Sequence, residues 1–325
     1  GFDSLVLAAR QLGRRGQPVD WLVVTRSAHE VVGSERVEPL GALVAGPCRV
    51  IPYEYEGHRC RNVDLAADDD LDLEVAILLR ELVSRDAHPV VAYRSGHRWC
   101  PGHAPLVTPG PEAARTAVPD GARCLLTGGT SGVGLAPAEA LSRAPGARVA
   151  LLARTPLPAR DTWDAVLASA PDARLGRTLR AIRRIEAAGS SVLTLAADVA
   201  DRPALAAALE RVRDELGGLD VVVHAAGVPG GGALEHKSLA AAWEVMAPKV
   251  QGTRHLWELT REDVLSALVL CSSLAAEIGG FGQVDYVAAN AFQDAFAAAH
   301  RDDDSSVTPR WVAGGSGPGR TRDRL

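Results

Sequence analysis

A glycine-rich turn is the clearest chemical feature of the sequence. It comprises Thr127, Gly128, Gly129, Thr130, Ser131, Gly132, Val133 and Gly134, after the apolar run CLLT and ahead of a helical pattern. Glycines at 128, 132 and 134 let the backbone approach a pyrophosphate, and the N-terminus of the next helix attracts its negative charge. In a chain with 32 glycines an ordinary tight turn is the alternative. The position between a strand and a helix favours nucleotide binding.

The end of the next predicted strand distinguishes the two nicotinamide cofactors. An acidic residue there binds the ribose 2′-hydroxyl of NAD, whereas arginine accommodates the 2′-phosphate of NADP. This chain has Arg154, and the next acid is only Asp161. Arg154 could be one more surface arginine, since 33 of the 35 basic side chains are arginine, but the missing acid predicts NADPH.

Two further strand ends fit the same cofactor. Asp198 and Val199 stand where an adenine ring would bind, although Asp198 could equally be the N-cap of the following helix. Ala225, Ala226 and Gly227 supply small residues where a ribose would approach the backbone.

The elements around these motifs form two α/β blocks. In the second block, near-continuous apolar strands alternate with helical patterns, which predicts a doubly wound parallel sheet. An alanine-rich helix is expected from Tyr286 to His300, and residues 155–177 are expected to be a surface excursion with a short helix around Trp163. The predicted strands are 124–128, 148–153, 191–198, 219–227 and 266–273.

The first block follows the same pattern without a glycine-rich turn at a strand end. Strands are expected at 19–25, 48–54 and 88–94, with a helix at 72–85 between the last two. We interpret it as a degenerate, structural Rossmann-like copy that packs on the second block and binds no cofactor. It begins in a helical pattern, so a preceding first strand is expected to lie outside the sequence.

These patterns give a domain division. We expect a structural subdomain at 1–107, a proline-rich linker at 108–121, a catalytic subdomain at 122–312 and a mobile, linker-like tail at 313–325.

Bulk properties exclude several classes of function. The 325 residues carry a net charge of −5, which argues against a nucleic-acid surface. No apolar run is long enough to cross a membrane, and the first residues lack a secretory signal. The five cysteines are scattered without metal-ligand spacing, so we expect no metal site and reduced thiols in the cytoplasm.

A serine, a tyrosine, an asparagine and a lysine complete the candidate site. Ser273 ends a predicted strand, Tyr286 follows thirteen residues later, Asn290 lies one helical turn beyond, and Lys249 stands in the segment MAPKVQG. Ser272 is the neighbour that could be mistaken for Ser273, and Lys237, the only other lysine, is expected at the surface. Each residue alone has an ordinary structural explanation, and it is their joint spacing that indicates a site.

This arrangement resembles the short-chain dehydrogenase/reductase superfamily, and within it the ketoreductase domains of modular polyketide synthases. Free-standing members have lysine four residues after the tyrosine, whereas here asparagine stands there and lysine comes earlier. The segments HAAGV (224–228), APKVQGT (247–253) and SSLAAEIGGFGQVDYVAANA (272–291) are similar to that family, as is YRSGHRW (93–99) in the first block.

The resemblance implies NADPH-dependent reduction of a β-ketoacyl chain for polyketide (antibiotic) biosynthesis. The chain would be carried on the phosphopantetheine arm of an acyl carrier protein, alongside other domains of the same synthase. Tyr286 would donate the proton and Ser273 would hold the carbonyl oxygen. Lys249 would favour the phenolate and bind the nicotinamide ribose, and Asn290 would bind a backbone group or a water.

The sequence departs from the family in two places. Family members that give the D-hydroxy product have Leu-Asp-Asp after HAAGV, where this chain has Pro229, Gly230 and Gly231. Those giving the L-hydroxy product have tryptophan where Ile278 stands. The missing aspartates favour the L-hydroxy side. The segment 307–311 offers only the tryptophan of the family's Asn-Trp pair, so we expect either that the family's lid helix is absent or that part of the chain is not represented.

Two other functions remain open. One is a non-reducing domain that binds NADPH for structure or epimerises an α-substituent. The other is a free-standing dehydrogenase that acts on a diffusible alcohol.

Overall fold

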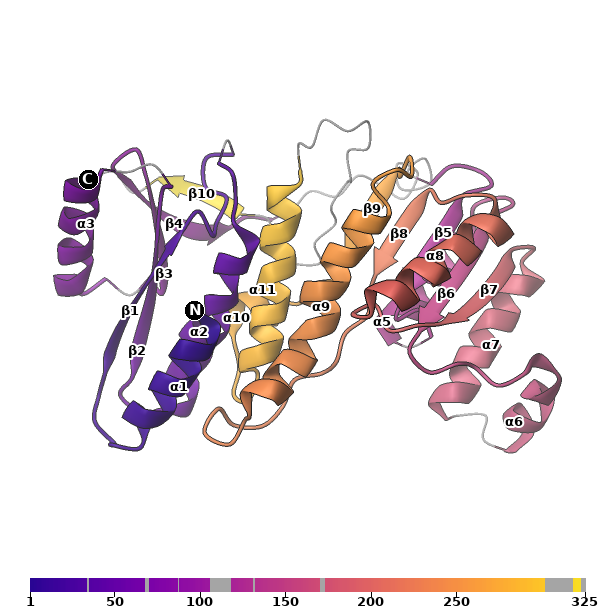
Figure 1. The fold of residues 1–325 in the computed structure, drawn as a ribbon, viewed down its shortest axis with the longest axis horizontal. Coiled ribbons are helices and arrows are strands. Elements are labelled where there is room, and N and C mark those ends of the chain that lie inside the picture. The colour runs from indigo at the N-terminus through magenta and orange to yellow at the C-terminus, as the bar shows by residue number, and fades with distance from the viewer. Residues whose placement is uncertain are drawn as a thin grey trace.

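The computed structural model describes residues 1–33, 35–67, 70–86, 88–105, 118–130, 132–169 and 173–301, and the backbone of 318–322. These residues form two five-stranded sheets with helices between and around them (Figure 1). The predicted α/β architecture of two sheet-containing subdomains is confirmed.

The second sheet has the strand order β7-β6-β5-β8-β9, and all its neighbouring strands are parallel. Successive side chains of a strand point to opposite faces of the sheet. Leu125 therefore packs in the hydrophobic cluster on one face and Leu126 in the cluster on the other. The carboxyl ends of all five strands therefore lie at one edge. The predicted strands are confirmed as β5 (Arg123–Thr127), β6 (Arg148–Ala153), β7 (Ser191–Ala196), β8 (Val221–His224) and β9 (Ala267–Leu270).

Helices cover both faces of this sheet, as expected for a doubly wound fold. The short helix predicted around Trp163 and the long alanine-rich helix both form. On one face lie α5 (Gly132–Leu141), α6 (Trp163–Ser169), which follows the turn η2 (Arg160–Thr162), and α7 (Arg174–Ala187); on the other lie α8 (Arg202–Leu216), α9 (Leu239–Leu259) and α11 (Val284–Ala299), and α10 (Ala275–Ile278) links β9 to α11.

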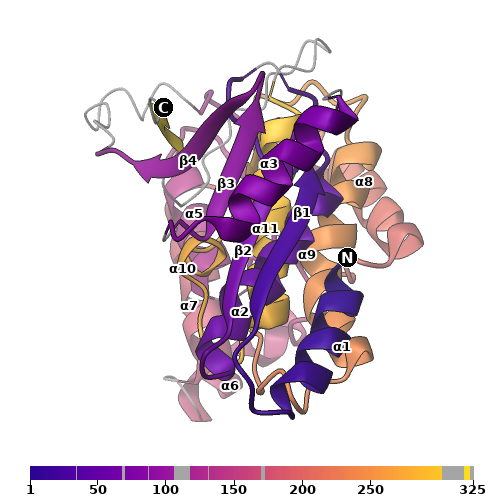
Figure 2. The same ribbon diagram turned by 90° about the vertical axis from the view of Figure 1, so that its left-hand side faces the viewer.

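The first sheet has the order β1-β2-β3-β4-β10, and it is mixed rather than wholly parallel. Strands β1, β2 and β3 are parallel, whereas β4 is antiparallel to both of its neighbours. Figure 2 looks onto this sheet, with α3 in front of the strands and α9 and α11 behind. Its elements are α1 (Phe2–Gly13), β1 (Asp20–Arg26), η1 (Pro39–Val44), α2 (Ala45–Glu54), β2 (Arg59–Leu65), α3 (Leu71–Val83), β3 (Val90–Arg94) and β4 (His97–His103).

The prediction of a strand at residues 48–54 is wrong, because this segment lies in helix α2. Packing decides its conformation: a side chain on Gly46 would collide with the carbonyl oxygen of Val284, so α2 lies directly against α11. Strands β2 and β4 were not predicted, and in β2 both Asn62 and Asp64 are buried. Asp64 accepts hydrogen bonds from the Thr25 hydroxyl at 2.7 Å and the Arg94 guanidinium at 2.6 Å, so the strand lacks an apolar pattern.

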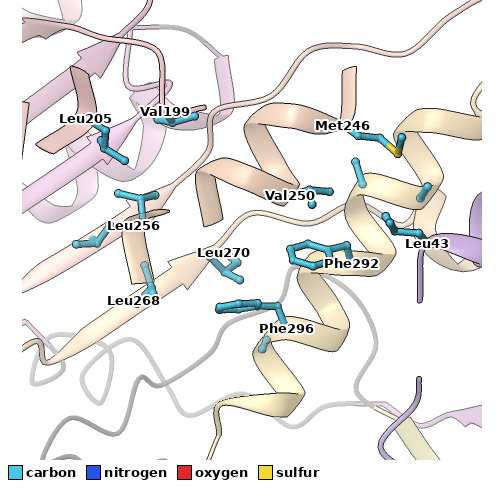
Figure 3. Close-up of a cluster of buried hydrophobic side chains, with 14 of the residues drawn as sticks. Leu43, Val199, Leu205, Met246, Val250, Leu256, Leu268, Leu270, Phe292 and Phe296 are labelled. Atoms are coloured by element: carbon cyan, nitrogen blue, oxygen red, sulfur yellow. The ribbon is translucent and has the colours of Figure 1, made fainter. Parts of the chain in front are cut away.

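The two subdomains share one hydrophobic core. Figure 3 shows Leu43 of η1 in the same cluster as Met246 and Val250 of α9 and Phe292 of α11. The expected packing of the first block against the second is therefore confirmed. Hydrogen bonds reinforce it, since the Trp243 indole on α9 donates to Asp3 of α1 at 3.0 Å.

The predicted linker and tail are described only in part. Residues 108–117 of the linker and the segment 307–311 lie outside the described residues. In the tail, 318–322 do not form a linker: their backbone is strand β10, which pairs with the open edge of β4. All five cysteines are free thiols. None of the helices in the described ranges is long and apolar enough to span a membrane.

Candidate active site

The carboxyl ends of β5, β6, β7 and β8 surround a cavity of about 500 Å³. This is the edge at which ligands bind in doubly wound sheets. The contribution of α7 was not predicted: its residues Arg174 and Thr178 line the cavity. The Thr178 hydroxyl donates to the carbonyl oxygen of Thr130 at 2.6 Å. The predicted residues that line the cavity are Gly128, Thr130, Arg154, Asp198, Val199, Ala226 and Gly227.

The glycine turn has the tight backbone that its sequence predicts. Gly128 has a φ of +68°, and a Cβ there would lie 2.8 Å from the carbonyl oxygen of Ala225. A Cβ on Gly134 would collide with the backbone of Gly128. These two glycines let the turn pack between the ends of β5 and β8.

The other described residues of the turn are not among those that line the cavity. Gly129 lies beneath the turn against Leu126, and Val133 is 71% exposed. Gly132 begins α5 with open space around it, and Ser131 lies outside the described residues.

The charge around the cavity suits an anionic dinucleotide. Arg154 and Arg174 both line it, and Asp198 is the one carboxylate among the described residues that line it. Asp198 accepts from the backbone N–H of Ala200 at 2.9 Å, while the N-cap of α8 is Asp201. The alternative that Asp198 caps the helix is therefore wrong. A glycine cradle, a helix N-terminus and two guanidinium groups together fit a nicotinamide dinucleotide.

A buried histidine that was not predicted joins Thr127 of β5 to Pro248, which lines the cavity. His224 is fully buried, and its Nε2 lies 3.0 Å from the carbonyl oxygen of Pro248, which can only accept. Nε2 therefore carries the proton and Nδ1 accepts from the Thr127 hydroxyl at 2.6 Å. Thr127 is thus a structural link between β5 and β8 rather than a lining residue. Burial lowers the pKa of His224 from 6.5 to about 3.

This histidine should make the protein sensitive to acid. Between pH 6.5 and 3 the unfolded chain binds a proton on His224 that the folded chain excludes, so stability is lost as pH falls. The expected loss is about 1.4 kcal/mol per pH unit across this window. Urea unfolding of the wild type and of His224→Gln between pH 7 and 4 measures it. A difference in free energy between the two proteins that does not change with pH would exclude this role.

Lys249 is 5% exposed and projects from α9 toward α11. Its Nζ donates to the carbonyl oxygen of Cys271 at 2.5 Å and to Oε1 of Gln293 at 2.8 Å. Burial lowers the pKa of Lys249 to about 8. Among the described residues no hydrogen bond joins it to Tyr286, and its third N–H is left over.

Tyr286 and Asn290 lie in the first turns of α11. The Asn290 amide donates to the carbonyl oxygen of Tyr286 at 2.7 Å, while its buried Oδ1 has no partner. Such an orphaned acceptor fits a bound water or ligand group. Ser273 follows β9, where its hydroxyl accepts from the N–H of Ala275 at 3.2 Å, and the neighbouring Ser272 contacts the carbonyl oxygen of Asn290 at 3.4 Å.

The segment after β8 connects these side chains to the cofactor cavity. Gly227 lines the cavity, and a Cβ on it would lie 3.2 Å from Cε of Lys249. Three residues later, a Cβ on Gly230 would lie 2.8 Å from Cβ of Tyr286. The structure therefore brings Lys249 and Tyr286 to the same end of the sheet as the glycine turn.

The expectation that Lys237 lies at the surface is wrong. Its side chain is 4% exposed and forms an ion pair with Asp285, the residue before Tyr286, at 2.5 Å. Two lysines in an arginine-rich chain are thus both buried beside the same helix. That scarcity was the one signal in the sequence that could have indicated Lys237.

Comparisons with known proteins show which chains this one resembles. The family model for the KR domain matches residues 122–312. The chain is 32% identical over 90% of its length to "Polyketide synthase PksL" of Bacillus subtilis, and 34% identical over 94% to "Erythronolide synthase EryA3" of Saccharopolyspora erythraea. It spans only 7% and 9% of these two relatives.

Solved structures show the same fold. One titled "Structure of A-type Ketoreductases from Modular Polyketide Synthase" has 30% identity and a TM-score of 0.76, covering 95% of this chain and 62% of that one. A "C2-type Ketoreductase from a Modular Polyketide Synthase" has 26% identity and a TM-score of 0.75, with 95% and 62% covered.

Proposed function

The chain belongs to the KR-domain family of polyketide synthases, and we propose that it reduces a β-ketoacyl group on an acyl carrier protein to the β-hydroxyacyl product, using NADPH. The observation that carries this proposal is the course of the segment after β8, which runs from the cavity past Lys249 to Tyr286. Gly227 borders both the dinucleotide cavity and Lys249, and Gly230 borders Tyr286. This course supports the proposal that Tyr286 would be the proton donor to a ketone held beside the reduced nicotinamide.

The cofactor-binding residues follow from the strand ends. The glycine turn and the N-terminus of α5 would hold the pyrophosphate, and Arg154 the 2′-phosphate. Asp198 and Val199 would lie at the adenine, and the segment from Ala225 to Gly227 at the ribose. When bound, NADPH supplies the hydride for the β-carbon of the substrate.

The remaining residues manage the negative charge that develops on the ketone oxygen. Ser273 would donate a hydrogen bond to this oxygen, and the Tyr286 phenol would transfer its proton to it. The free N–H of Lys249 would bind the ribose and support the phenolate that is left. Asn290 would hold a water at its unpartnered Oδ1 for the return of the proton.

The test is to mix the protein with NADPH and the N-acetylcysteamine thioester of a β-keto acid and to follow the absorbance of the reduced nicotinamide. We expect consumption of NADPH together with formation of the β-hydroxy thioester. Binding of NADPH without consumption would indicate the non-reducing or epimerising alternative. Equal activity on a simple diffusible ketone would indicate a free-standing dehydrogenase.

Replacing Arg154 should change the preference between cofactors. A charge-assisted hydrogen bond to the 2′-phosphate contributes about 1.5–3 kcal/mol, so Arg154→Ala should weaken NADPH binding about 10- to 100-fold and leave NADH binding unchanged. Fluorescence titration with both cofactors measures this. Arg160→Ala is the control, because Arg160 is an exposed arginine paired with Glu186. An equal loss for NADH and NADPH would contradict the assignment.

The partner and the product also belong to the proposal. A substrate loaded on the phosphopantetheine arm of a carrier protein should be reduced with a lower KM than the free thioester. The reaction would run in the cytoplasm, where the five free thiols stay reduced. Chiral chromatography tests the expected L-hydroxy configuration.

A further inference from the structure

A buried ion pair adjoins the proposed proton donor without being part of the proposed chemistry. Nζ of Lys237 lies 2.5 Å from Oδ2 of Asp285, and the two side chains are 4% and 1% exposed. Lys237 belongs to the segment between β8 and α9, and Asp285 lies in the first turn of α11. The pair therefore joins two segments that are 48 residues apart in sequence.

Asp285 also fixes the backbone of Tyr286. Its Oδ1 accepts from the N–H of Tyr286 at 2.8 Å, so one carboxylate binds both the ammonium and the tyrosine backbone. Lys237 in turn reaches the carbonyl oxygen of Gly282 at 3.4 Å, in the turn that precedes α11. The start of this helix is held from both sides.

Gly230 completes the contact at the other end of the segment. A Cβ on Gly230 would lie 2.7 Å from Oδ1 of Asp285 and 2.8 Å from Cβ of Tyr286. Residues 229–233 and 236–238, together with Asp285, line a second cavity of about 500 Å³. The pair thus forms part of the wall of a cavity that lies next to Tyr286.

Stability alone does not account for this pair. Taking two charges out of water costs several kcal/mol per ion, and apolar side chains of similar volume often stabilise a fold as well or better. The segment has other anchors, because Glu54 of α2 accepts from the N–H groups of both Leu234 and Gly282. What the charges add is one defined position for the first turn of α11.

We propose that Lys237 and Asp285 are positioning residues that hold the Tyr286 side chain in reach of the substrate ketone by fixing the first turn of α11 against residues 229–232. This inference rests on the proposed function of Tyr286. It adds two residues that touch neither the cofactor cavity nor the reacting atoms, and it assigns the second cavity to the substrate side.

The first test compares Lys237→Met, Asp285→Asn and the double variant in the full chain. Misplacing a reacting group by about 1 Å can cost about 10²-fold, so we expect kcat to fall by about that factor while NADPH affinity stays within about twofold. Asp64→Asn is the matched control, because Asp64 forms an equally buried pair with Arg94 in the first sheet. It should lose stability and keep its kcat. A wild-type kcat in all three site variants would overturn the proposal.

Chemical rescue separates positioning by charge from the mere filling of space. In Lys237→Ala, n-propylammonium replaces the lost side-chain atoms and can enter through the adjoining cavity. We expect kcat to rise and saturate with its concentration, and not to rise with propan-1-ol, which has similar size and no charge. Rescue by both compounds, or by neither, would contradict the role of the ammonium.

Hydrogen exchange gives a readout that does not depend on activity. Amide exchange in peptides covering 229–234 and 284–288 should be faster in Lys237→Met than in the wild type, and unchanged in Asp64→Asn. If the wild type fails to consume NADPH, the proposed function is wrong, and this measurement still decides whether the pair fixes α11. Unchanged exchange at both peptides would refute the positioning role.

Discussion

Tyr286→Phe should lower kcat for ketone reduction by about 10³-fold and leave the affinity for NADPH within about twofold of the wild type. The substitution removes only the hydroxyl. Among the described residues, the hydrogen bonds of Tyr286 are made by its backbone, which donates to Asp285 and accepts from Asn290. The variant should therefore fold normally and bind cofactor, while the step that needs a proton fails.

The control for this experiment is Tyr93→Phe. The Tyr93 hydroxyl donates to Glu81 at 2.6 Å within the buried part of the first subdomain, so its loss should lower stability without changing kcat. Stopped-flow absorbance measures single turnovers, and cofactor fluorescence measures NADPH binding. Equal rates for the wild type and Tyr286→Phe would show that another group supplies the proton.

Lys249→Met should lower kcat by about 10²-fold and remove a decline in activity at high pH. Because burial lowers the pKa of Lys249 to about 8, the ammonium is lost above that pH in the free enzyme. The kcat/KM of the wild type should therefore fall as pH rises through about 8. A wild-type profile that stays flat to pH 9 would contradict the role of the ammonium.

The same residue should leave a signature in folding stability. Between pH 8 and 10.5 the unfolded chain keeps a proton on Lys249 that the folded chain has released, so the contribution of this residue to stability rises with pH. The expected rise is about 1.4 kcal/mol per pH unit. Below pH 8 both states are protonated, and burial of the ammonium is a constant cost.

Unfolding of the wild type and Lys249→Met in parallel isolates this effect. Burial raises the pKa of the Cys124 thiol to about 12, which destabilises both proteins at high pH and cancels in the comparison. The stability of the wild type relative to the variant should increase from pH 8 to 9. A constant difference across that range would mean that the folded protein does not release this proton early.

The sequence is informative where a strand is buried on both faces. Leu125, Leu126, Leu151 and Leu152 belong to uninterrupted apolar runs, and all four are buried as predicted. In the first subdomain the same rule fails, because β2 buries Asn62 and Asp64, whose partners come from other strands. A polar residue that is satisfied only by tertiary contacts looks like a surface residue in the sequence.

The candidate site likewise contains residues that local sequence predicts and residues that only tertiary contacts explain. Arg154, Asp198 and Gly227 could be predicted because each follows a strand whose end is fixed by the fold. His224 and Lys237 could not, because a buried histidine or lysine is recognisable only through its partners. Each of them binds a group from a segment distant in sequence, and sequence spacing does not indicate such pairs.

The contact between α2 and α11 limits how this protein can be recombined. Gly46 touches the backbone of Val284, and Glu54 holds the turn at Gly282, so the helix that carries Tyr286 is shaped partly by residues far upstream of the linker. A hybrid joined within 108–121 would combine an α2 from one parent with an α11 from another. Exchanges between synthases should therefore transfer both subdomains together, with the crossover points placed before the first subdomain and after the second.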